Sequence, residues 1–131
     1  MNVTNAKTGF SLVEIMIVIV IMGLLLGVGI PTFISQKRQA NLNTTKANLA
    51  VLSGAIDSYN MEFNNYPKKL DDLLHPPKGT SFLSKKQLPK DSWGTAFMYK
   101  ETPGKEHPYE LYSYGPNKLA AKPEERISAW D

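Results

Sequence analysis

Hydrophobic residues in this chain are concentrated near its N-terminus, and their spacing changes along the sequence. No residue from Ile15 to Gln36 is charged, and a run of this length can cross a bilayer core, which takes about 20 helical residues. From Thr32 onward the apolar residues recur at steps of three, four and seven, the spacing of one helix face. The members of this stripe are Leu42, Leu49, Leu52, Ile56, Tyr59 and Phe63. The pattern predicts one long helix, apolar first and then amphipathic, that ends at about residue 64.

The residues after this helix predict a small β-sheet. A short helical turn at 70–75 is stopped by Pro76 and Pro77. Three segments rich in aromatic and apolar residues follow, at 96–100, 110–114 and 126–130, and turns with Pro and Gly separate them. We therefore expect an α+β fold. In it a long N-terminal helix, with a membrane-spanning half and an amphipathic half, packs on a small antiparallel head.

Composition narrows the range of functions. The chain has no cysteine, which excludes disulfide redox chemistry and thiolate zinc sites. Its formal net charge is +3 and its lysines are interspersed with carboxylates, so no basic face for nucleic acid is predicted. His75 and His107 each lie beside a proline, without metal-ligand spacing or a serine partner in the sequence. We expect neither an enzyme nor a nucleic-acid-binding protein.

The apolar N-terminal run has three interpretations. A plain membrane anchor explains its length and nothing more. A secretory signal peptide would be cleaved at Gly-Val-Gly, residues 27–29, and would leave a periplasmic binding module that starts near Ile30. Glu14, at the head of the apolar core, argues against a signal peptide. The third interpretation depends on the residues around this glutamate.

Residues 7–14, Lys-Thr-Gly-Phe-Ser-Leu-Val-Glu, resemble the prepilin signature of type IV pilins and pseudopilins. The resemblance implies that a prepilin peptidase cuts after Gly9 and N-methylates the new first residue, Phe10. It also identifies Glu14 with the family's characteristic acidic residue, which sets the register of subunits during filament assembly. Pro31 falls where the family places the proline that kinks its helix.

The physical chemistry of Glu14 supports such a role. A carboxylate within a membrane-spanning segment costs about 2.5–3.5 kcal/mol on insertion scales, so it needs a partner. No lysine or arginine lies nearby on the same helix face. Cleavage after Gly9 would create an α-amine, whose ordinary pKa is about 7.7–8.0. Glu14 of one subunit could neutralise the Phe10 amine of its neighbour and remove both charges together. The alternative is that Glu14 lies in the headgroup region without a partner.

Four motifs in the second half of the chain narrow the resemblance. They are Tyr66-Pro67, LPKDSWG at 88–94, PGK at 103–105 and YELYSYG at 109–115. They resemble the G-type major pseudopilin of type II secretion, in which patterns such as LPKDPWG, PGKHG and DLYSYGADG are usual. The resemblance implies a type IV pilin-like fold with three parts. Residues 1–9 form a leader peptide that is removed, 10–34 the transmembrane and filament-core helix, and 35–131 the periplasmic head.

The function that this resemblance implies is structural. Such a subunit polymerises into the periplasmic pseudopilus of a Gram-negative type II secretion system and drives export of folded proteins across the outer membrane. The implied partners are further copies of the chain, minor pseudopilins, prepilin peptidase, and the inner-membrane assembly platform with its ATPase. The implied location is the inner membrane, crossed once, with the head in the periplasm. A type IV pilin for adhesion, motility or DNA uptake is the alternative, although many such pilins carry a C-terminal disulfide and this chain has no cysteine.

The last loop departs from the G-type pattern. In that family it resembles a calcium site of aspartates and main-chain carbonyls, which suits calcium's preference for about six to eight oxygen ligands. Here Asn117 stands where one aspartate is expected, and Arg126 falls near the position of the other. If calcium is kept, the candidate ligands are Leu111, Asn117, Glu124 and Glu125. We favour a loop without metal or other cofactor, in which Arg126 pairs with Glu124, Glu125 or the C-terminal carboxylate.

Overall fold

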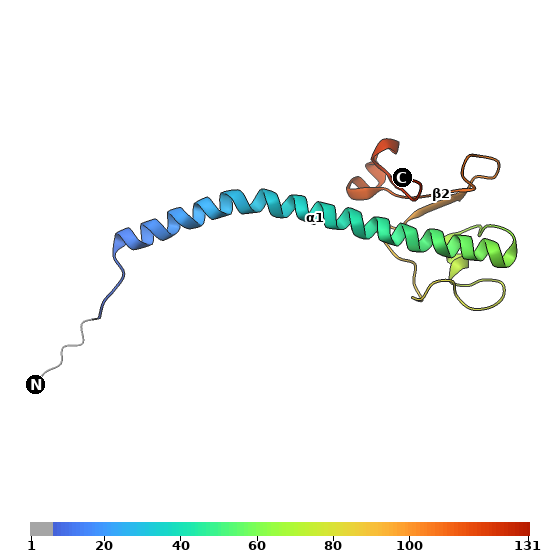
Figure 1. Cartoon of the computed structure of the whole chain (residues 1–131), viewed down its shortest axis with the longest axis horizontal. Coiled ribbons are helices and arrows are strands. Elements are labelled where there is room, and N and C mark those ends of the chain that lie inside the picture. The colour runs from blue at the N-terminus through green and yellow to red at the C-terminus, as the bar shows by residue number, and fades with distance from the viewer. Residues whose placement is uncertain (1–6) are drawn as a thin grey trace, which may run out of the picture. The chain divides into compact units, whose positions relative to one another are not determined.

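The computed structural model describes residues 7–131, so the first six residues of the predicted leader lie outside the described residues. The long helix α1 runs from Leu12 to Phe63 and includes 52 residues (Figure 1). It ends where Asn64 adopts a left-handed backbone conformation, with φ of 56°, a conformation that commonly terminates helices. This end agrees with the predicted end at about residue 64.

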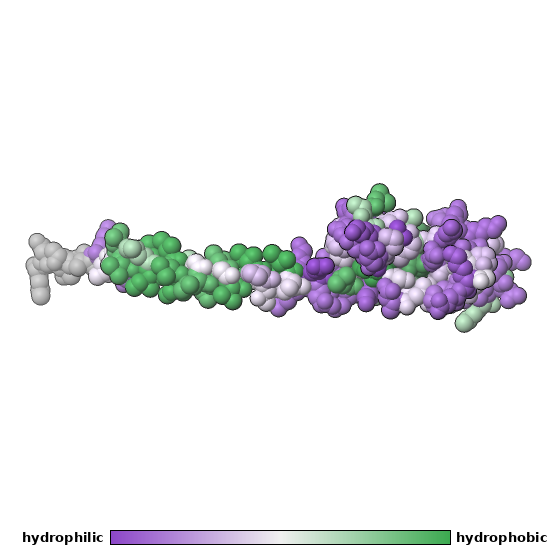
Figure 2. All heavy atoms as spheres, turned by 90° about the horizontal axis from the view of Figure 1, so that it is seen from above, coloured by the Kyte–Doolittle hydropathy of each residue, from purple (hydrophilic) through white to green (hydrophobic). Residues whose placement is uncertain are grey.

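The chain divides into two compact units, Met1–Arg38 and Gln39–Asp131, and α1 contributes to both. In the first unit every side chain from residue 7 onward is exposed, and hydrophobic residues cover the surface of the helix (Figure 2). The helix is long and apolar enough to cross a membrane. Large apolar side chains that are exposed in this way need a lipid or protein environment to cover them.

The second unit contains the sheet, which consists of β1 (Met98–Glu101), β2 (Tyr109–Ser113) and β3 (Ile127–Ser128). The order is β1-β2-β3 and both pairings are antiparallel. The first two strands lie within two residues of the predicted segments. The third strand is shorter than the predicted 126–130. The chain turns there because the Ser128 N–H donates to Asp131 Oδ2 at 2.8 Å and the Trp130 N–H donates to Ser128 Oγ at 3.1 Å.

Three short 3₁₀ helices complete the second unit: η1 (Leu70–Leu73), η2 (Gly115–Ala120) and η3 (Pro123–Glu125). The first of them is the predicted helical turn, shortened to four residues. The other two lie in the C-terminal loop between β2 and β3, for which the sequence predicted no helical element. Pro116 and Pro123 each lie at the start of one of them, a position where a missing N–H costs nothing.

A single hydrophobic core joins the amphipathic half of α1 to the sheet. The predicted stripe is confirmed, since Leu49, Leu52, Ile56 and Tyr59 are buried and Leu42 and Phe63 are partly buried against them. α1 also contributes Ala55, and the other buried members come from η1, the loops and the sheet: Leu70, Leu73, Leu83, Phe97, Tyr109, Leu111 and Ile127. The predicted α+β architecture, a long helix with a small antiparallel sheet packed on its second half, is therefore confirmed.

Candidate functional site

The predicted cleavage site lies in an exposed, non-helical segment directly before α1. Gly9 and Phe10 have no regular secondary structure, and the Phe10 side chain is 87% exposed. A peptide bond outside a helix has no intrahelical hydrogen bonds to break before it enters a protease. The bond between these two residues therefore lies in an exposed segment without helical hydrogen bonds, as the predicted cleavage requires.

Glu14 caps the N-terminus of α1 together with Ser11. The Ser11 N–H donates to Glu14 Oε2 at 2.7 Å, and the Glu14 N–H donates to Ser11 Oγ at 3.2 Å. These reciprocal bonds form a capping box, which satisfies two backbone donors that a helix start otherwise leaves unpaired. A carboxylate near a helix N-terminus is also favoured by the helix dipole. The pattern Ser-x-x-Glu at residues 11–14 is a known sign of this motif, and it is a signal beyond those used above to predict the helix.

The capping box gives Glu14 a partner within its own chain. A carboxylate has about four lone-pair sites, so the bond from the Ser11 N–H leaves capacity for another donor. The proposed bond to a neighbour's amine is therefore compatible with the cap. Pro31 lies inside α1, which continues on both sides of it. Its kink stays a prediction.

In the head, Asp91 connects the motif at 88–94 to the motif at 109–115 by hydrogen bonds. It is only 5% exposed. Its Oδ1 accepts hydrogen bonds from the N–H groups of Trp93 at 3.1 Å and Thr95 at 2.7 Å, and its Oδ2 accepts one from Ser113 Oγ at 2.6 Å. A buried carboxylate is stable only when its acceptors are satisfied in this way. Asp91 therefore fixes the fold of the loop at 88–94 and its position beside β2.

The same loop is hydrogen-bonded to α1. Thr45 is fully buried, and its hydroxyl donates to Ser92 Oγ at 3.1 Å while it accepts the Ser92 N–H at 3.2 Å. The Ser92 hydroxyl in turn donates to the Asn41 carbonyl at 2.8 Å. Asn48 Nδ2 donates to the Lys90 carbonyl at 3.0 Å. Polar residues that interrupt the apolar stripe of α1 thus hold the loop in place.

The C-terminal loop contradicts the ion pairs predicted for Arg126. No ion pair joins Arg126 to a carboxylate within residues 7–131. Its guanidinium carbon lies instead over the rings of Tyr112, at 4.8 Å from the centroid, and Tyr114, at 5.5 Å. The planar, weakly hydrated guanidinium stacks well on aromatic faces. This packing is the physical reason that the predicted pairing is wrong.

Glu125 interacts with the loop backbone and with an amide. Its Oε2 accepts hydrogen bonds from Asn117 Nδ2 at 2.9 Å and from the Lys122 N–H at 3.2 Å. The hydrogen bond from Asn117 lowers the pKa of Glu125, and the backbone bond from Lys122 lowers it further. The carboxylate therefore stays ionised at neutral pH and connects η2 to η3.

The oxygen atoms proposed as calcium ligands in this loop do not fit that ion. The described residues include no group of three or more His, Cys, Asp or Glu side chains that could hold a metal ion. The Leu111 carbonyl already accepts the Ala129 N–H at 2.9 Å, and Asn117 directs its NH₂ group to Glu125. A fixed guanidinium in the same loop repels a cation. Of the four candidate ligands, Leu111 and Glu124 line one hollow together with Arg126, whereas Asn117 and Glu125 are bonded to each other, so groups of the loop itself compete with a bound cation.

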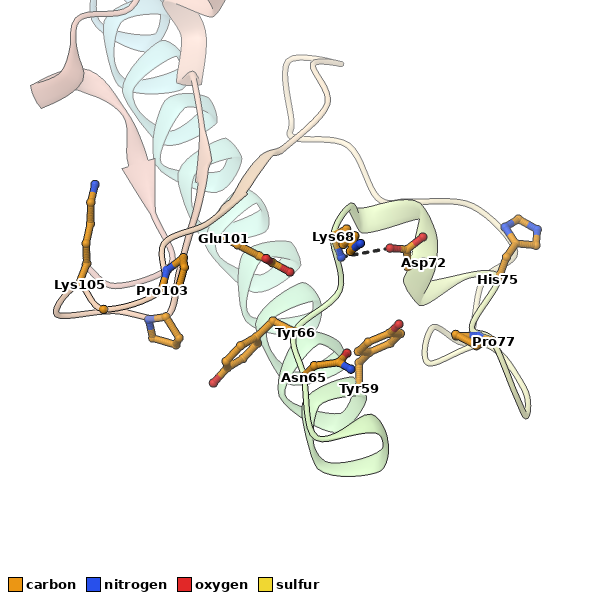
Figure 3. Close-up of a pocket in the computed structure, with 12 residues that line it drawn as sticks. Tyr59, Asn65, Tyr66, Lys68, Asp72, His75, Pro77, Glu101, Pro103 and Lys105 are labelled. Atoms are coloured by element: carbon orange, nitrogen blue, oxygen red, sulfur yellow. Dashed lines mark hydrogen bonds between the residues drawn. The ribbon is translucent and has the colours of Figure 1, made fainter.

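The head also carries a hollow of about 850 Å³ between the end of α1, η1 and the turn after β1 (Figure 3). Tyr59, Tyr66 and three prolines line much of it, together with Lys68 and Asp72. Its lining includes no serine, threonine or cysteine that could act as a nucleophile. Neighbouring phenols serve as hydrogen-bonding groups: Tyr99 Oη donates to the Pro67 carbonyl at 2.6 Å, and burial raises the pKa of Tyr99. The lining thus combines apolar rings with a few charged side chains.

Comparison with known families covers almost the whole chain. Residues 32–130 match the family model described as type II secretion system protein G, and residues 4–30 match the prokaryotic N-terminal methylation motif. The chain belongs to the type II secretion system protein G family. The G-type resemblance of the second half and the prepilin-like signature at residues 7–14 are both confirmed by these matches.

Individual relatives agree with this assignment to the protein G family. The type II secretion system core protein G of Pseudomonas aeruginosa is 33% identical over 121 residues, which cover 83% of each chain. The corresponding protein of Escherichia coli K12 is 32% identical over 127 residues, which cover 89% of this chain and 87% of the relative. A crystal structure of the major pseudopilin from the type 2 secretion system of enterohaemorrhagic E. coli matches with a TM-score of 0.59. That match covers 73% of this chain and 87% of the other at 24% identity, and it confirms the type IV pilin-like fold.

Proposed function

We propose that this protein G family member is a structural subunit of the pseudopilus of a type II secretion system. In this proposal its polymerisation drives the export of folded proteins across the outer membrane. One observation carries the proposal: an exposed, non-helical Gly9–Phe10 segment leads directly into an apolar helix that Glu14 caps. Removal of residues 1–9 by prepilin peptidase would leave Phe10 as a methylated N-terminus beside that carboxylate.

The assembly step depends on charge neutralisation at Glu14. Before polymerisation the carboxylate is stabilised by the Ser11 N–H and by the start of the helix. In the filament it would accept a further hydrogen bond from the Phe10 amine of a neighbouring subunit, which removes two charges from an apolar environment. This pairing fixes the axial register between subunits, since only one displacement brings amine and carboxylate together.

The apolar half of α1 would serve two environments in turn. Its exposed side chains suit the inner membrane before assembly and the filament core afterwards. Residues 10–34 would thus anchor the subunit in the membrane, and the head at 35–131 would face the periplasm. Minor pseudopilins, the inner-membrane assembly platform and its ATPase are the other partners in this proposal. Calcium has no role in it, because the donors of the C-terminal loop do not fit that ion.

The culture-supernatant proteome of a deletion strain tests this function. We expect a defined set of exported proteins to disappear, to return with the wild-type gene and to stay absent with Glu14→Ala. Glu62→Ala is the matched control, because Glu62 is an exposed carboxylate near the other end of α1. If secretion is unchanged while twitching or DNA uptake fails, the chain is a type IV pilin instead.

Mass spectrometry of the mature N-terminus tests the processing step separately. We expect a chain that begins at N-methylated Phe10. A chain that begins near Ile30 would identify the N-terminal segment as a cleaved signal peptide and would overturn the proposal.

A further inference from the structure

A second hollow of the head, of about 400 Å³ and open to solvent, lies between β2 and the C-terminal segment. Three carboxylates line it, those of Glu110, Glu124 and Asp131. Glu110 pairs with Lys105, whose Nζ lies 3.5 Å from Glu110 Oε1, whereas Glu124 and Asp131 form no ion pair among the described residues. Negative side chains around one hollow repel each other and favour a further counter-ion. The hollow is also lined by Arg126, so the loop itself supplies a positive charge at this place.

The position of Arg126 is fixed by aromatic packing. The Tyr112 and Tyr114 rings lie edge to face, at 5.5 Å between centroids and an interplanar angle of 89°, and the guanidinium lies over both. Its Nε is buried and has no hydrogen-bond partner among the residues that the structure describes. A guanidinium stays protonated at every pH of interest. Arg126 is therefore a permanent charge that the two rings hold against the acidic hollow.

Glu125 closes the same loop by two hydrogen bonds. Its bonds from Asn117 and from the Lys122 N–H connect the helix that follows β2 to the one that precedes β3. A bound cation would connect these two segments by taking oxygen ligands from each. Here a carboxylate and an amide of the chain already make that connection.

We propose that Arg126 is a tethered counter-ion for the acidic hollow and that the Glu125–Asn117 bond closes the loop, so that this head folds without a divalent metal. The proposal goes beyond the function proposed above, since it concerns the folding of the head and needs no filament. It separates this chain from the calcium-dependent pattern that its family resemblance implies.

Thermal unfolding of the full-length protein in detergent micelles, followed by tryptophan fluorescence, tests the proposal. Both tryptophans, Trp93 and Trp130, lie in the head, so the signal reports on this unit alone. We expect the wild-type Tm to be the same in EGTA and in millimolar calcium chloride. A wild-type Tm that falls in EGTA, or rises with calcium, overturns the proposal.

Two exposed glutamates of the head provide a matched pair of variants. Glu125→Gln removes a charge that holds the loop, whereas Glu106→Gln removes an equal charge from an exposed residue that does not line the acidic hollow. We expect Glu125→Gln to lower the Tm by several degrees and Glu106→Gln to leave it close to that of the wild type. Equal effects of the two substitutions would contradict the role given to Glu125.

The counter-ion role of Arg126 has its own test. We expect Arg126→Gln to lower the Tm and calcium chloride to restore part of that loss, because the acidic hollow has then lost its positive charge. Arg126→Lys keeps the charge and loses the planar stacking, so its Tm should not respond to calcium. If calcium fails to restore Arg126→Gln, or restores both variants equally, Arg126 acts by packing alone and the counter-ion role is wrong.

Discussion

The hydroxyl of Ser113 donates a hydrogen bond of 2.6 Å to Oδ2 of Asp91, across 22 positions of the sequence. Ser113 Oγ also accepts the Gly115 N–H at 3.0 Å. One carboxylate and one hydroxyl thus connect the loop at 88–94, the end of β2 and the start of the C-terminal loop. Two motifs that look separate in the sequence form one polar network in the fold.

We expect Asp91→Ala to destabilise the head by about 3 kcal/mol, because it leaves three donors without their acceptor and each buried unsatisfied group costs about 1–3 kcal/mol. Asp91→Asn keeps one acceptor oxygen and should cost less, about 1–2 kcal/mol. Urea denaturation followed by tryptophan fluorescence measures both. Asp71→Asn is the control, since Asp71 is exposed, and a loss as large as that of Asp91→Asn would contradict the network.

The burial of one face of α1 predicts that substitutions at two adjacent residues have different effects on stability. Leu52 is fully buried in the hydrophobic core of the head, whereas the adjacent Val51 is 58% exposed. We expect Leu52→Ala to lower the free energy of unfolding of the head by about 2–5 kcal/mol, and Val51→Ala to change it by less than about 0.5 kcal/mol. Similar losses from both substitutions would show that the packed face of α1 is assigned wrongly.

Backbone conformation predicts a stabilising substitution in the C-terminal loop. Lys118 has φ of 50° and ψ of −136°, a combination that glycine adopts far more easily than other residues. We expect Lys118→Gly to stabilise the head by about 1 kcal/mol, because the relief of strain exceeds the added entropy of the unfolded chain. Lys122→Gly is the control. Its residue has φ of −68°, so the same change should destabilise by about 0.5–1 kcal/mol.

The lowered pKa of Glu125 predicts how the stability of the loop depends on pH. In the unfolded chain this carboxyl titrates near its ordinary pKa of 4.5, and in the folded head it titrates lower. The folded state therefore binds fewer protons, so the stabilisation is complete above the unfolded pKa and is lost as the pH falls through the folded pKa. We expect the Tm difference between wild type and Glu125→Gln to be constant near neutral pH and to shrink below pH 4.5. A difference that persists at lower pH would exclude this titration as its cause.

The sequence predicted the elements whose signals are local and repeated. The stripe on α1 has six apolar members at regular helical spacing, and the helix end is marked by the residues around Asn64, so both were found. The place of Arg126 was not, because charge alone suggested a carboxylate partner. Its tyrosine partners lie 12 and 14 positions earlier, and only the pairing of β2 with β3 brings them close.

The hydrogen-bond network around Asp91 shows another limit of prediction from the sequence. The loop at 88–94 was recognised as a motif, but its bonds to Thr45 and Ser113 depend on tertiary packing that no local pattern encodes. At the start of α1 the signal is local. The spacing of Ser11 and Glu14 predicts a capping box by itself, whereas the interpretation of Glu14 from its charge offers only a role in assembly or a place in the headgroup region.

Glu14 has two roles, since it caps α1 and carries the charge proposed for assembly. Substitutions can separate these two roles. Glutamine at this position of a capping box can still accept the Ser11 N–H, but it carries no charge. We expect Glu14→Gln to keep α1 capped and yet to abolish secretion as fully as Glu14→Ala, because a neutral amide cannot neutralise the amine of a neighbouring Phe10. Ser11→Ala removes a capping hydroxyl and leaves the charge in place, so it should keep most of the secretion. The supernatant proteome measures all three variants in the deletion strain. If Glu14→Gln secretes normally while Ser11→Ala does not, capping of the helix and not the charge is what assembly requires.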